Sequence, residues 1–315
     1  MLRTIWNALC RAIAWIGVRI LLCGPVPQHI AIIMDGNRRF ADRAGIDRKS
    51  GHGFGYDSLI QTLELCLDLG VRYVTVYAFS IDNFARSQEE VSALMELMRE
   101  KLDLLVSNEG LATAKGIRVC VLGDLTLLPE DVRASANRAM AATKHNSITV
   151  LNICVAYTST QEIVNATREA VKEALGLSSS KSGGSQLTNE NDGRNSLKTL
   201  DSQITKESIE RHLYTAGSPW PDVLIRTSGE TRLSNFMLWQ ACHSHLAFCN
   251  VLWPNFSFRH LFWIIFQYQK SYRSLQHHWI KAQSFWIILQ YQRSNRSLQH
   301  HWHKAQSFQT RQKFG

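Results

Sequence analysis

Short apolar runs alternate with amphipathic stretches along most of the chain. Each run is bounded by glycine, proline or polar residues, which is typical of strands buried on both faces. Strands that alternate with helices build βαβ units. The pattern therefore predicts an α/β fold, a single domain over 25–275 with a mainly parallel six-stranded sheet surrounded by helices. The predicted strands lie between Pro27 and Gly36 and over 74–79, 117–122, 148–155, 222–226 and 246–253.

Several helix starts can be predicted from polar residues that precede apolar periodicity. Ser87 with Glu90, and Ser159 with Glu162, have the spacing of a capping box. Ser234 is predicted to cap a helix that follows the fifth strand. These residues therefore place three helix starts shortly after predicted strands.

Residues 1–24 place apolar side chains at helical spacing and arginines on the opposite side, which predicts an amphipathic helix. Arg3, Arg11 and Arg19 argue against a segment that spans a membrane, because a spanning helix needs about 20 predominantly apolar residues. The helix suits the interface of a membrane. A helix that docks on the protein's own core explains the pattern nearly as well.

Two segments depart from the α/β pattern. From 177 to 203 the sequence is rich in Ser, Gly, Asn and Lys, which is typical of a flexible surface insertion. The C-terminal extension, 276–315, contains a duplicated helical segment, since 262–283 and 285–306 align at an offset of 23 residues. A solenoid needs at least three units, so exon duplication or a gene-model artefact is the leading explanation.

The formal charge of +9 and the isoelectric point of about 9.3 favour acidic partners such as nucleic acid, anionic lipid or diphosphates. No recognised nucleic-acid-binding motif occurs, so nucleic acid is not predicted as a partner. The seven cysteines are odd in number and lack paired metal spacing. They are interpreted as reduced core residues in a cytosolic environment.

The first predicted strand ends in a concentration of charged and polar groups: Asp35, Gly36, Asn37, Arg38 and Arg39 follow one another directly. Ligands of open α/β sheets bind at this end of the strands. Arginine forks hold phosphate through paired hydrogen bonds, and an aspartate among them suits a divalent metal shared with the phosphates. The residues therefore predict a site for a metal-bound, phosphorylated substrate. A tight turn before a solvated basic helix is the alternative.

Four segments resemble signatures of the cis-prenyltransferases, the family of undecaprenyl and dehydrodolichyl diphosphate synthases. The resemblance covers 25–275, and the signatures occur in the family's order. The third and fourth are most similar to eukaryotic, especially plant-like, dehydrodolichyl diphosphate synthases. The segments are His29–Phe40 (HIAIIMDGNRRF), Gly51-His52 with a helix predicted to begin after Gly53, Tyr77–Phe84 (YAFSIDNF) and Asp222–Phe236 (DVLIRTSGETRLSNF).

The resemblance implies an enzyme that joins isopentenyl diphosphate to an allylic diphosphate, usually farnesyl diphosphate, with a new double bond in cis geometry. The implied product is a long-chain polyprenyl (dehydrodolichyl) diphosphate for dolichol synthesis and protein glycosylation. The implied fold encloses a hydrophobic tunnel for the growing chain. Product length stays open between dolichol precursor, rubber-like polymer and shorter products.

The resemblance also implies roles for individual residues. Asp35 would bind Mg²⁺ shared with the diphosphate, and His52 would assist the departure of the allylic diphosphate. Ser80 and Asn83 would place or deprotonate the reacting carbon of the second substrate, and Asn37 completes the catalytic set. The implied binding residues are Gly36, Arg38, Arg39 and Arg48 around the allylic diphosphate, and Arg226, Arg232 and Ser234 around isopentenyl diphosphate. Phe40 and Phe84 would cover the reacting chains, and Arg86 is also implied to bind substrate.

Two departures from the family's pattern concern assembly. Many bacterial members carry a glutamate at the position of His245, where it contributes to the metal site across the dimer. They also carry an Arg-x-Gly motif near the C-terminus, for which the closest match here is Lys313-Phe314-Gly315, and lysine does not reproduce a guanidinium fork. Eukaryotic relatives typically obtain that motif from a Nogo-B-receptor-type partner subunit.

The resemblance therefore predicts such a partner subunit, or a homodimer, on the cytosolic face of the endoplasmic reticulum membrane. The alternative is a non-catalytic, membrane-associated partner or scaffold subunit. A scaffold would need none of the charged and polar residues in the four signatures.

Overall fold

The computed structural model describes residues 2–176 and 204–272, with side chains from residue 12 onward. The chain divides into two compact units, Met1–Gln267 and Tyr268–Gly315. The sheet and the site described below belong to the first unit, and residues 268–272 of the second are helical. The predicted insertion at 177–203 and the predicted extension at 276–315 lie outside the described residues.

Six strands form one sheet in the order β3-β4-β2-β1-β5-β6, and every pairing in it is parallel. The prediction of a mainly parallel six-stranded sheet is confirmed. The strands are β1 His29–Ile33, β2 Tyr73–Ser80, β3 Ile117–Leu122, β4 Thr149–Tyr157, β5 Val223–Arg226 and β6 His245–Phe248.

The strand order reverses at β1: β2 pairs with one edge of β1, and β5, later in the chain, pairs with its other edge. Every residue of β1 is buried, as expected for a central strand of a parallel sheet. Its last residue, Ile33, is level with Tyr77 of β2 and Arg226 of β5. The carboxyl ends of these three strands therefore meet at one edge, where α/β proteins place their ligands.

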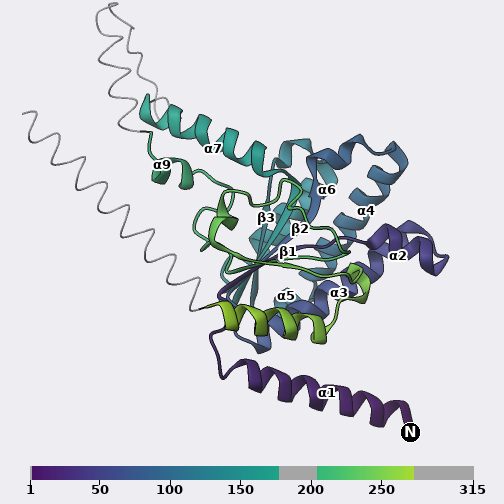
Figure 1. The fold of residues 1–315 in the computed structure, drawn as a ribbon. Helices are drawn as coiled ribbons and strands as arrows, with labels where there is room; N and C mark the ends of the chain where they lie inside the picture. The colour runs from purple at the N-terminus through teal and green to yellow at the C-terminus, as the bar shows by residue number, and fades with distance from the viewer. Residues whose placement is uncertain (1, 177–203, 273–315) are drawn as a thin grey trace, which may run out of the picture. The chain divides into compact units, whose positions relative to one another are not determined.

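Helices follow most of the strands and surround the sheet (Figure 1). Helices α2 and α3 follow β1, α4 follows β2, and α7 follows β4, so their first turns lie near the carboxyl edge of the sheet. The helices are α1 Leu2–Leu21, α2 Asn37–Ala44, α3 Arg48–Asp68, α4 Gln88–Leu105, α5 Leu111–Ala114, α6 Glu130–Ala142, α7 Ser159–Ala174 and α9 Lys206–Glu210, and residues 258–272 are also helical.

Helix α3 begins earlier than predicted. Asp47 caps it by accepting a hydrogen bond from the backbone N–H of Ser50 at 2.8 Å, so Gly51 and Gly53 lie inside the helix. Gly51 is required by close packing, because a Cβ there would lie 2.8 Å from the Cβ of Ala41 in α2. The prediction of a helix beginning after Gly53 is wrong, because both glycines lie inside α3 and Gly51 serves packing rather than a turn.

Two other predicted features need correction. Thr158, not Ser159, caps α7 by accepting from the backbone N–H of Gln161. Strand β6 ends at Phe248 rather than continuing to 253. Beyond that strand, the carbonyls of Cys249 and Val251 accept hydrogen bonds from the backbone N–H groups of Gly229 and Ser228 in the loop after β5. The predicted cap at Ser87 is confirmed, since its hydroxyl accepts from the N–H of Glu90.

The predicted N-terminal helix is present as α1, and it has a buried side and an exposed side. Gly17 lies against the ring of Phe258, and Val18 and Leu21 are buried. The other side exposes Ile13, Trp15, Ile16 and Ile20. Docking on the protein's own chain therefore accounts for only part of the apolar pattern. Within 2–176 and 204–272, no helix has the length and apolar character needed to cross a membrane.

Candidate active site

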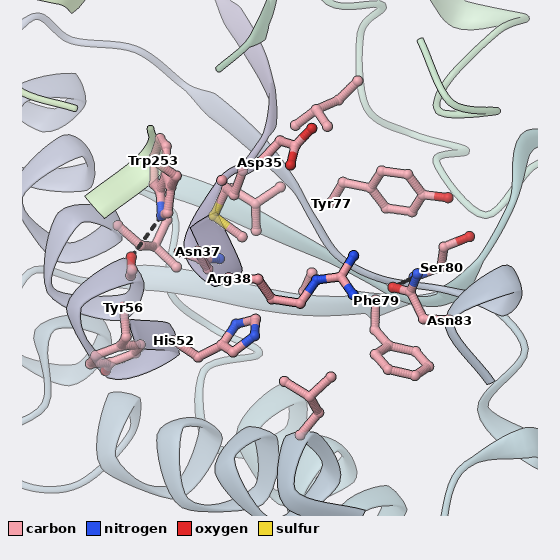
Figure 2. A pocket seen from close by; sticks show the side chains of 18 of the residues that line it. Asp35, Asn37, Arg38, His52, Tyr56, Tyr77, Phe79, Ser80, Asn83 and Trp253 are labelled. Atoms are coloured by element: carbon pink, nitrogen blue, oxygen red, sulfur yellow. Dashed lines mark hydrogen bonds between the residues drawn. The ribbon is translucent and has the colours of Figure 1, made fainter. Parts of the chain in front are cut away.

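A cavity of about 780 Å³ lies at the carboxyl ends of β1, β2 and β5 (Figure 2). Its polar lining comes from the loops after these strands and from α2 and α3, and most of its apolar lining comes from α3, α4 and β2. All predicted site residues line the cavity except two, Phe40 and Phe84. The lining residues from the sequence-based set are Asp35, Gly36, Asn37, Arg38, Arg39, Arg48, His52, Ser80, Asn83, Arg86, Arg226, Arg232 and Ser234.

The two phenylalanines have apolar partners elsewhere. The ring of Phe40 contacts Phe54 with centroids 5.6 Å apart, and the ring of Phe84 contacts Phe79 at 4.9 Å. Neither is a lining residue of the cavity, so the structure does not place them over the reacting groups.

The backbone of Asp35 is held in place from two sides. The hydroxyl of Thr227, just after β5, accepts from the N–H of Asp35 at 3.0 Å and donates to its carbonyl at 2.7 Å. The N–H of Trp253 donates to the same carbonyl at 3.0 Å. The carboxylate of Asp35 therefore extends into the cavity from a fixed point (Figure 2).

The carboxylate of Asp35 is kept ionised by its neighbours. Nη2 of Arg226 donates to it at 2.9 Å, and Nη2 of Arg39 lies 3.6 Å away. Burial alone would raise the pKa of Asp35, but hydrogen bonds from Arg226 and Ser228 and the two guanidinium charges outweigh burial and lower the pKa. Asp35 is therefore an anion at neutral pH.

The turn between β1 and α2 depends on Gly36. Its φ of 110° is disfavoured for other residues, and a Cβ there would lie 2.9 Å from Leu252. Helix α2 then starts at Asn37, whose side chain is held close to Gly55 of α3. The Asn37 Oδ1 atom is buried without a hydrogen-bond partner. An unpaired buried oxygen beside a cavity is a site where a ligand donor would be stabilised.

His52 projects from α3 toward the same space (Figure 2). Its Nε2 atom is buried and has no hydrogen-bond partner. Burial, together with the charges of Arg86 and Arg38, lowers the pKa of His52 to about 4 against the opposing effect of Glu90. The imidazole is therefore neutral at pH 7 and has a free ring nitrogen next to arginines.

Three arginines gather around one carboxylate at the start of α4. Glu90 lies 2.8 Å from Arg86, 3.1 Å from Arg48 and 3.8 Å from Arg38. One negative charge does not neutralise three guanidinium groups, so this wall of the cavity stays cationic. We did not predict a charge role for Glu90, because its spacing after Ser87 explained it as a capping residue.

A second group of donors surrounds β5. The side chain of Arg226 is 5% exposed. Its Nη1 donates to the carbonyl of Arg232 and to the hydroxyl of Ser234, both at 2.6 Å. The prediction that Ser234 caps a helix is wrong, because its backbone has a φ of 46° and its hydroxyl accepts from Arg226. Arg232 is exposed and contacts Glu230.

Ser80, the last residue of β2, and Asn83, in the 3-10 turn Ile81–Ala85 that follows, lie on the opposite wall. The backbone N–H of Ser80 donates to Oδ1 of Asn83 at 3.1 Å, and the Ser80 hydroxyl accepts from the N–H of Asp82 (Figure 2). The register of β2 against β4 shifts around Phe79, which is the local irregularity expected of a bulge near a site. The turn therefore presents a hydroxyl and an amide as one rigid unit.

The apolar part of the lining lies on α3 and α4. The ammonium of Lys101 lies 4.6 Å from the ring centroid of Tyr56, which joins the two helices. A hydrocarbon chain can occupy such a surface while its charged end stays with the arginines. The apolar lining residues of these two helices are Tyr56, Leu59, Leu94, Leu97, Met98, Leu102 and Leu105.

The donors present fit a magnesium ion only in part. Across the described residues, no group of three or more His, Cys, Asp or Glu side chains could hold a metal by itself. Asp35 supplies one ionised carboxylate inside a cavity rich in arginine. Magnesium is commonly bound through one or two carboxylates, with substrate phosphates and water as the remaining ligands. The site thus fits an ion that arrives with a diphosphate.

Some of the site was missed at the sequence level. Thr227 and Ser228 occur within the fourth signature, yet they were not assigned roles. Thr227 fixes the Asp35 backbone, and Ser228 binds Arg39 through its hydroxyl at 2.6 Å and its carbonyl at 3.2 Å. Trp253 was missed because no local pattern places it beside the first strand.

Comparison with known proteins agrees with this geometry. Residues 33–276 match the family model described as "Putative undecaprenyl diphosphate synthase". Over 264 residues the chain is 46% identical to a dehydrodolichyl diphosphate synthase of Solanum lycopersicum, which covers 82% of this chain and 89% of that protein. Over 277 residues it is 43% identical to a subunit of the dehydrodolichyl diphosphate synthase complex of Homo sapiens, covering 87% of this chain and 74% of that protein.

A solved structure shares the fold. The lavandulyl diphosphate synthase of Lavandula x intermedia, in complex with dimethylallyl diphosphate, superposes with a TM-score of 0.66 at 31% identity, covering 78% of this chain and 95% of that one. With the family match over most of the chain and relatives above 40% identity, the chain belongs to the cis-prenyltransferase family of undecaprenyl diphosphate synthases and is an enzyme that transfers prenyl groups.

Proposed function

We propose that the enzyme condenses isopentenyl diphosphate with farnesyl diphosphate and releases a long-chain polyprenyl (dehydrodolichyl) diphosphate for dolichol synthesis and protein glycosylation. The observation that carries the proposal is the cavity itself, in which arginines from three strand ends adjoin an apolar wall. An isoprenoid diphosphate likewise has two parts, a charged diphosphate that suits the arginines and a hydrocarbon chain that suits the apolar wall. Relatives named dehydrodolichyl diphosphate synthases support the dolichol-type product.

In this proposal the allylic diphosphate lies against the turn after β1. The arginines of that turn and those gathered at Glu90 would bind its oxygens, while the hydrocarbon lies along α4. The carbon–oxygen bond breaks and its electron pair leaves with the diphosphate, so the cationic wall stabilises charge as it develops. His52 donates a hydrogen bond to the departing group. A bound polyanion would favour the protonated imidazole and raise the pKa of His52 from about 4.

Isopentenyl diphosphate would lie beside β5, where Arg226, Arg232 and Ser234 hold its phosphates. Its double bond attacks the allylic carbon, which leaves a positive charge on the isopentenyl unit. A proton is then lost from the isopentenyl carbon next to that charge, and its bonding electrons form the cis double bond. Ser80 and Asn83 would orient that carbon beside a diphosphate oxygen that takes the proton. Asp35 would hold magnesium, which supplies charge neutralisation for the diphosphate when bound.

Labelled isopentenyl diphosphate tests the proposal. The full chain is incubated with farnesyl diphosphate, with and without magnesium, and the products are extracted and separated by chain length. We expect label in a ladder of polyprenyl diphosphates only when both magnesium and the allylic substrate are present. Folded protein that incorporates no label, alone or with a partner subunit, would contradict the proposed reaction.

We propose that the active form is a complex with a Nogo-B-receptor-type subunit rather than a homodimer. A relative that is 43% identical is itself a subunit of a synthase complex, which supports this assembly. The same transfer assay, run with and without the purified partner, distinguishes the two forms. Full turnover by the chain alone would favour the homodimer.

We also propose that α1 holds the enzyme on the cytosolic face of the endoplasmic reticulum membrane. Its exposed isoleucines and tryptophan can enter the headgroup region. Replacing both Ile16 and Ile20 by serine should lower binding to phospholipid vesicles about tenfold in a flotation assay, because two apolar side chains are lost. The matched control is Ile148→Ser, an equally exposed isoleucine outside α1. Equal losses in both variants would contradict a specific role for α1.

A further inference from the structure

The segment 232–238, here called the β5 arm, has a strained backbone. Ser234, Asn235 and Met237 have φ values of 46°, 59° and 46°, in the left-handed region that residues with a side chain seldom adopt. Such conformations persist only where the surroundings hold them, and they are concentrated at functional sites. The arm carries Arg232 and Ser234, so the contacts that hold it also determine where these two groups lie.

Apolar packing provides part of the contacts that fix the β5 arm. Phe236 and Met237 are fully buried in a cluster with Ile33 of β1 and Tyr157 of β4. The ring of Phe236 stacks on Tyr77 with centroids 4.6 Å apart. These contacts fix the middle of the arm, but they do not determine how its polar residues are oriented.

Hydrogen bonds to the first turn of α7 also fix the β5 arm. The side-chain Oδ1 of Asn235 accepts from the backbone N–H of Thr160 at 3.0 Å and from its hydroxyl at 2.9 Å. The Asn235 carbonyl accepts from the N–H of Ser159 at 2.7 Å, and the Ser159 hydroxyl accepts from the N–H of Leu238 at 3.0 Å. First-turn N–H groups lack partners within their own helix, so the arm satisfies them.

The anchored arm leads directly to the charged centre of the site. Next to Asn235, the Ser234 hydroxyl accepts from Arg226, which also binds the Arg232 carbonyl. The other end of the same guanidinium donates to Asp35. Hydrogen bonds, together with the peptide link between Asn235 and Ser234, thus connect the start of α7 to the carboxylate of Asp35.

We propose that Asn235 is a positioning residue for the subsite that binds isopentenyl diphosphate. It is not a lining residue of the cavity. It acts through its bonds to α7, which hold the strained backbone of Ser234. That backbone in turn fixes the Ser234 hydroxyl and the Arg232 carbonyl at Arg226, beside the place where the second diphosphate would bind. This inference rests on the proposed function, which assigns Arg226, Arg232 and Ser234 to that substrate.

The test uses substitutions that separate the backbone from the side chain. Asn235→Gly accepts the positive φ without strain but removes the oxygen that binds Thr160. We expect it to raise KM for isopentenyl diphosphate about tenfold and to leave KM for farnesyl diphosphate unchanged. It should lower kcat no more than about threefold, because losing one hydrogen-bonded anchor weakens substrate binding more than it slows the chemical step. Asn235→Asp keeps both acceptor contacts and tolerates this backbone, so it should restore KM to within about twofold.

The matched pair on the other side of the contact is Thr160→Val and Thr160→Ser. Valine removes the hydroxyl and keeps the backbone N–H, so KM for isopentenyl diphosphate should rise about threefold. Serine keeps both donors and should behave as the unchanged enzyme. A contact without importance for positioning would leave the two variants alike.

Equilibrium binding makes the inference independent of turnover. Titration of isopentenyl diphosphate into the full chain by calorimetry should show about tenfold weaker binding for Asn235→Gly than for the unchanged chain. Equal binding, or an equal rise in both KM values, would overturn the positioning role, the second result indicating a structural defect. If the unchanged chain binds isopentenyl diphosphate but transfers no prenyl group, either alone or with the partner subunit, the proposed function fails while the binding comparison still decides the role of Asn235.

Discussion

Asp35→Asn is expected to lower kcat for prenyl transfer by about 10²- to 10³-fold, the range found when one preorganised electrostatic group is removed from an active site. Asparagine has the same shape and keeps an oxygen that Arg226 can bond, so the cavity should retain its form. The carboxylate charge is lost, and with it the only protein ligand that we assign to magnesium. The measurement is kcat as a function of magnesium concentration, which should show little response in the variant.

The matched control for this substitution is Asp57→Asn, an exposed carboxylate on α3 outside the cavity. It should change kcat by less than about threefold, in line with other surface substitutions. Circular dichroism of both variants checks that the fold is intact. A variant of Asp35 that keeps its full kcat and its response to magnesium would contradict the assignment of the metal to this residue.

The strands were predictable because burial in a parallel sheet leaves a local trace. Residues 117–122 were predicted as a strand from an apolar run alone, and the structure has β3 over Ile117–Leu122. The position of the site was predictable for a related reason. In a parallel sheet, the polar residues that follow each strand all collect at one edge, so Asp35, Ser80 and Arg226 meet although they are distant in sequence.

The loop after β5 was not predictable in the same way. In the β5 arm the residues with positive φ include no glycine that would announce that conformation, and a Ser-Asn pair after a strand is typical of a helix cap. The competing contacts come from Ser159 and Thr160, more than seventy residues earlier in the chain. Local patterns do not contain such long-range hydrogen bonds, which here outweigh the local preference for a helix.

The same limit explains the helix starts that were wrong. Ser159 and Glu162 have capping-box spacing, but the Ser159 hydroxyl accepts from Leu238. The carboxylate of Glu162 is buried, where it accepts hydrogen bonds from Tyr157 and Gln240. Burial raises the pKa of Glu162 despite these bonds. A residue drawn into tertiary contacts cannot also serve the local motif, so capping patterns predict least where helices begin beside a site.

Arg226 is the residue on which both halves of the site depend, so its substitution should have the second largest effect. The guanidinium bonds Asp35, Ser234 and the carbonyl of Arg232 at once. Arg226→Lys retains a positive charge, but an ammonium cannot reproduce the fork that spans these three acceptors. We expect kcat/KM for isopentenyl diphosphate to fall about 10²-fold in steady-state assays. A fall below threefold would show that charge alone is sufficient.

Arg226→Met extends the argument to stability. Removing the buried partner leaves the carboxylate of Asp35 partly buried without its main hydrogen bond, which should lower the free energy of unfolding by about 3 kcal/mol at pH 7.5. With Arg226 present, the pKa of Asp35 lies below its ordinary value of 3.8, so ionised Asp35 stabilises the fold above that pH. In the variant, burial dominates and the pKa of Asp35 rises.

The sign of the pH dependence follows because the pKa of Asp35 is lowered in the unchanged enzyme and raised in Arg226→Met. As pH falls through the raised pKa of Asp35 in the variant, protonation removes the carboxylate charge that has lost Arg226. The unchanged enzyme loses its own stabilisation at still lower pH. The stability gap between the two proteins should therefore be largest at neutral pH and shrink as the solution is acidified through the raised pKa of Asp35 in the variant. Urea unfolding at pH 7.5 and pH 4.5 measures the gap. A gap of equal size at both values would indicate that Arg226 stabilises the fold through packing and its bonds to the β5 arm, not through the charge of Asp35.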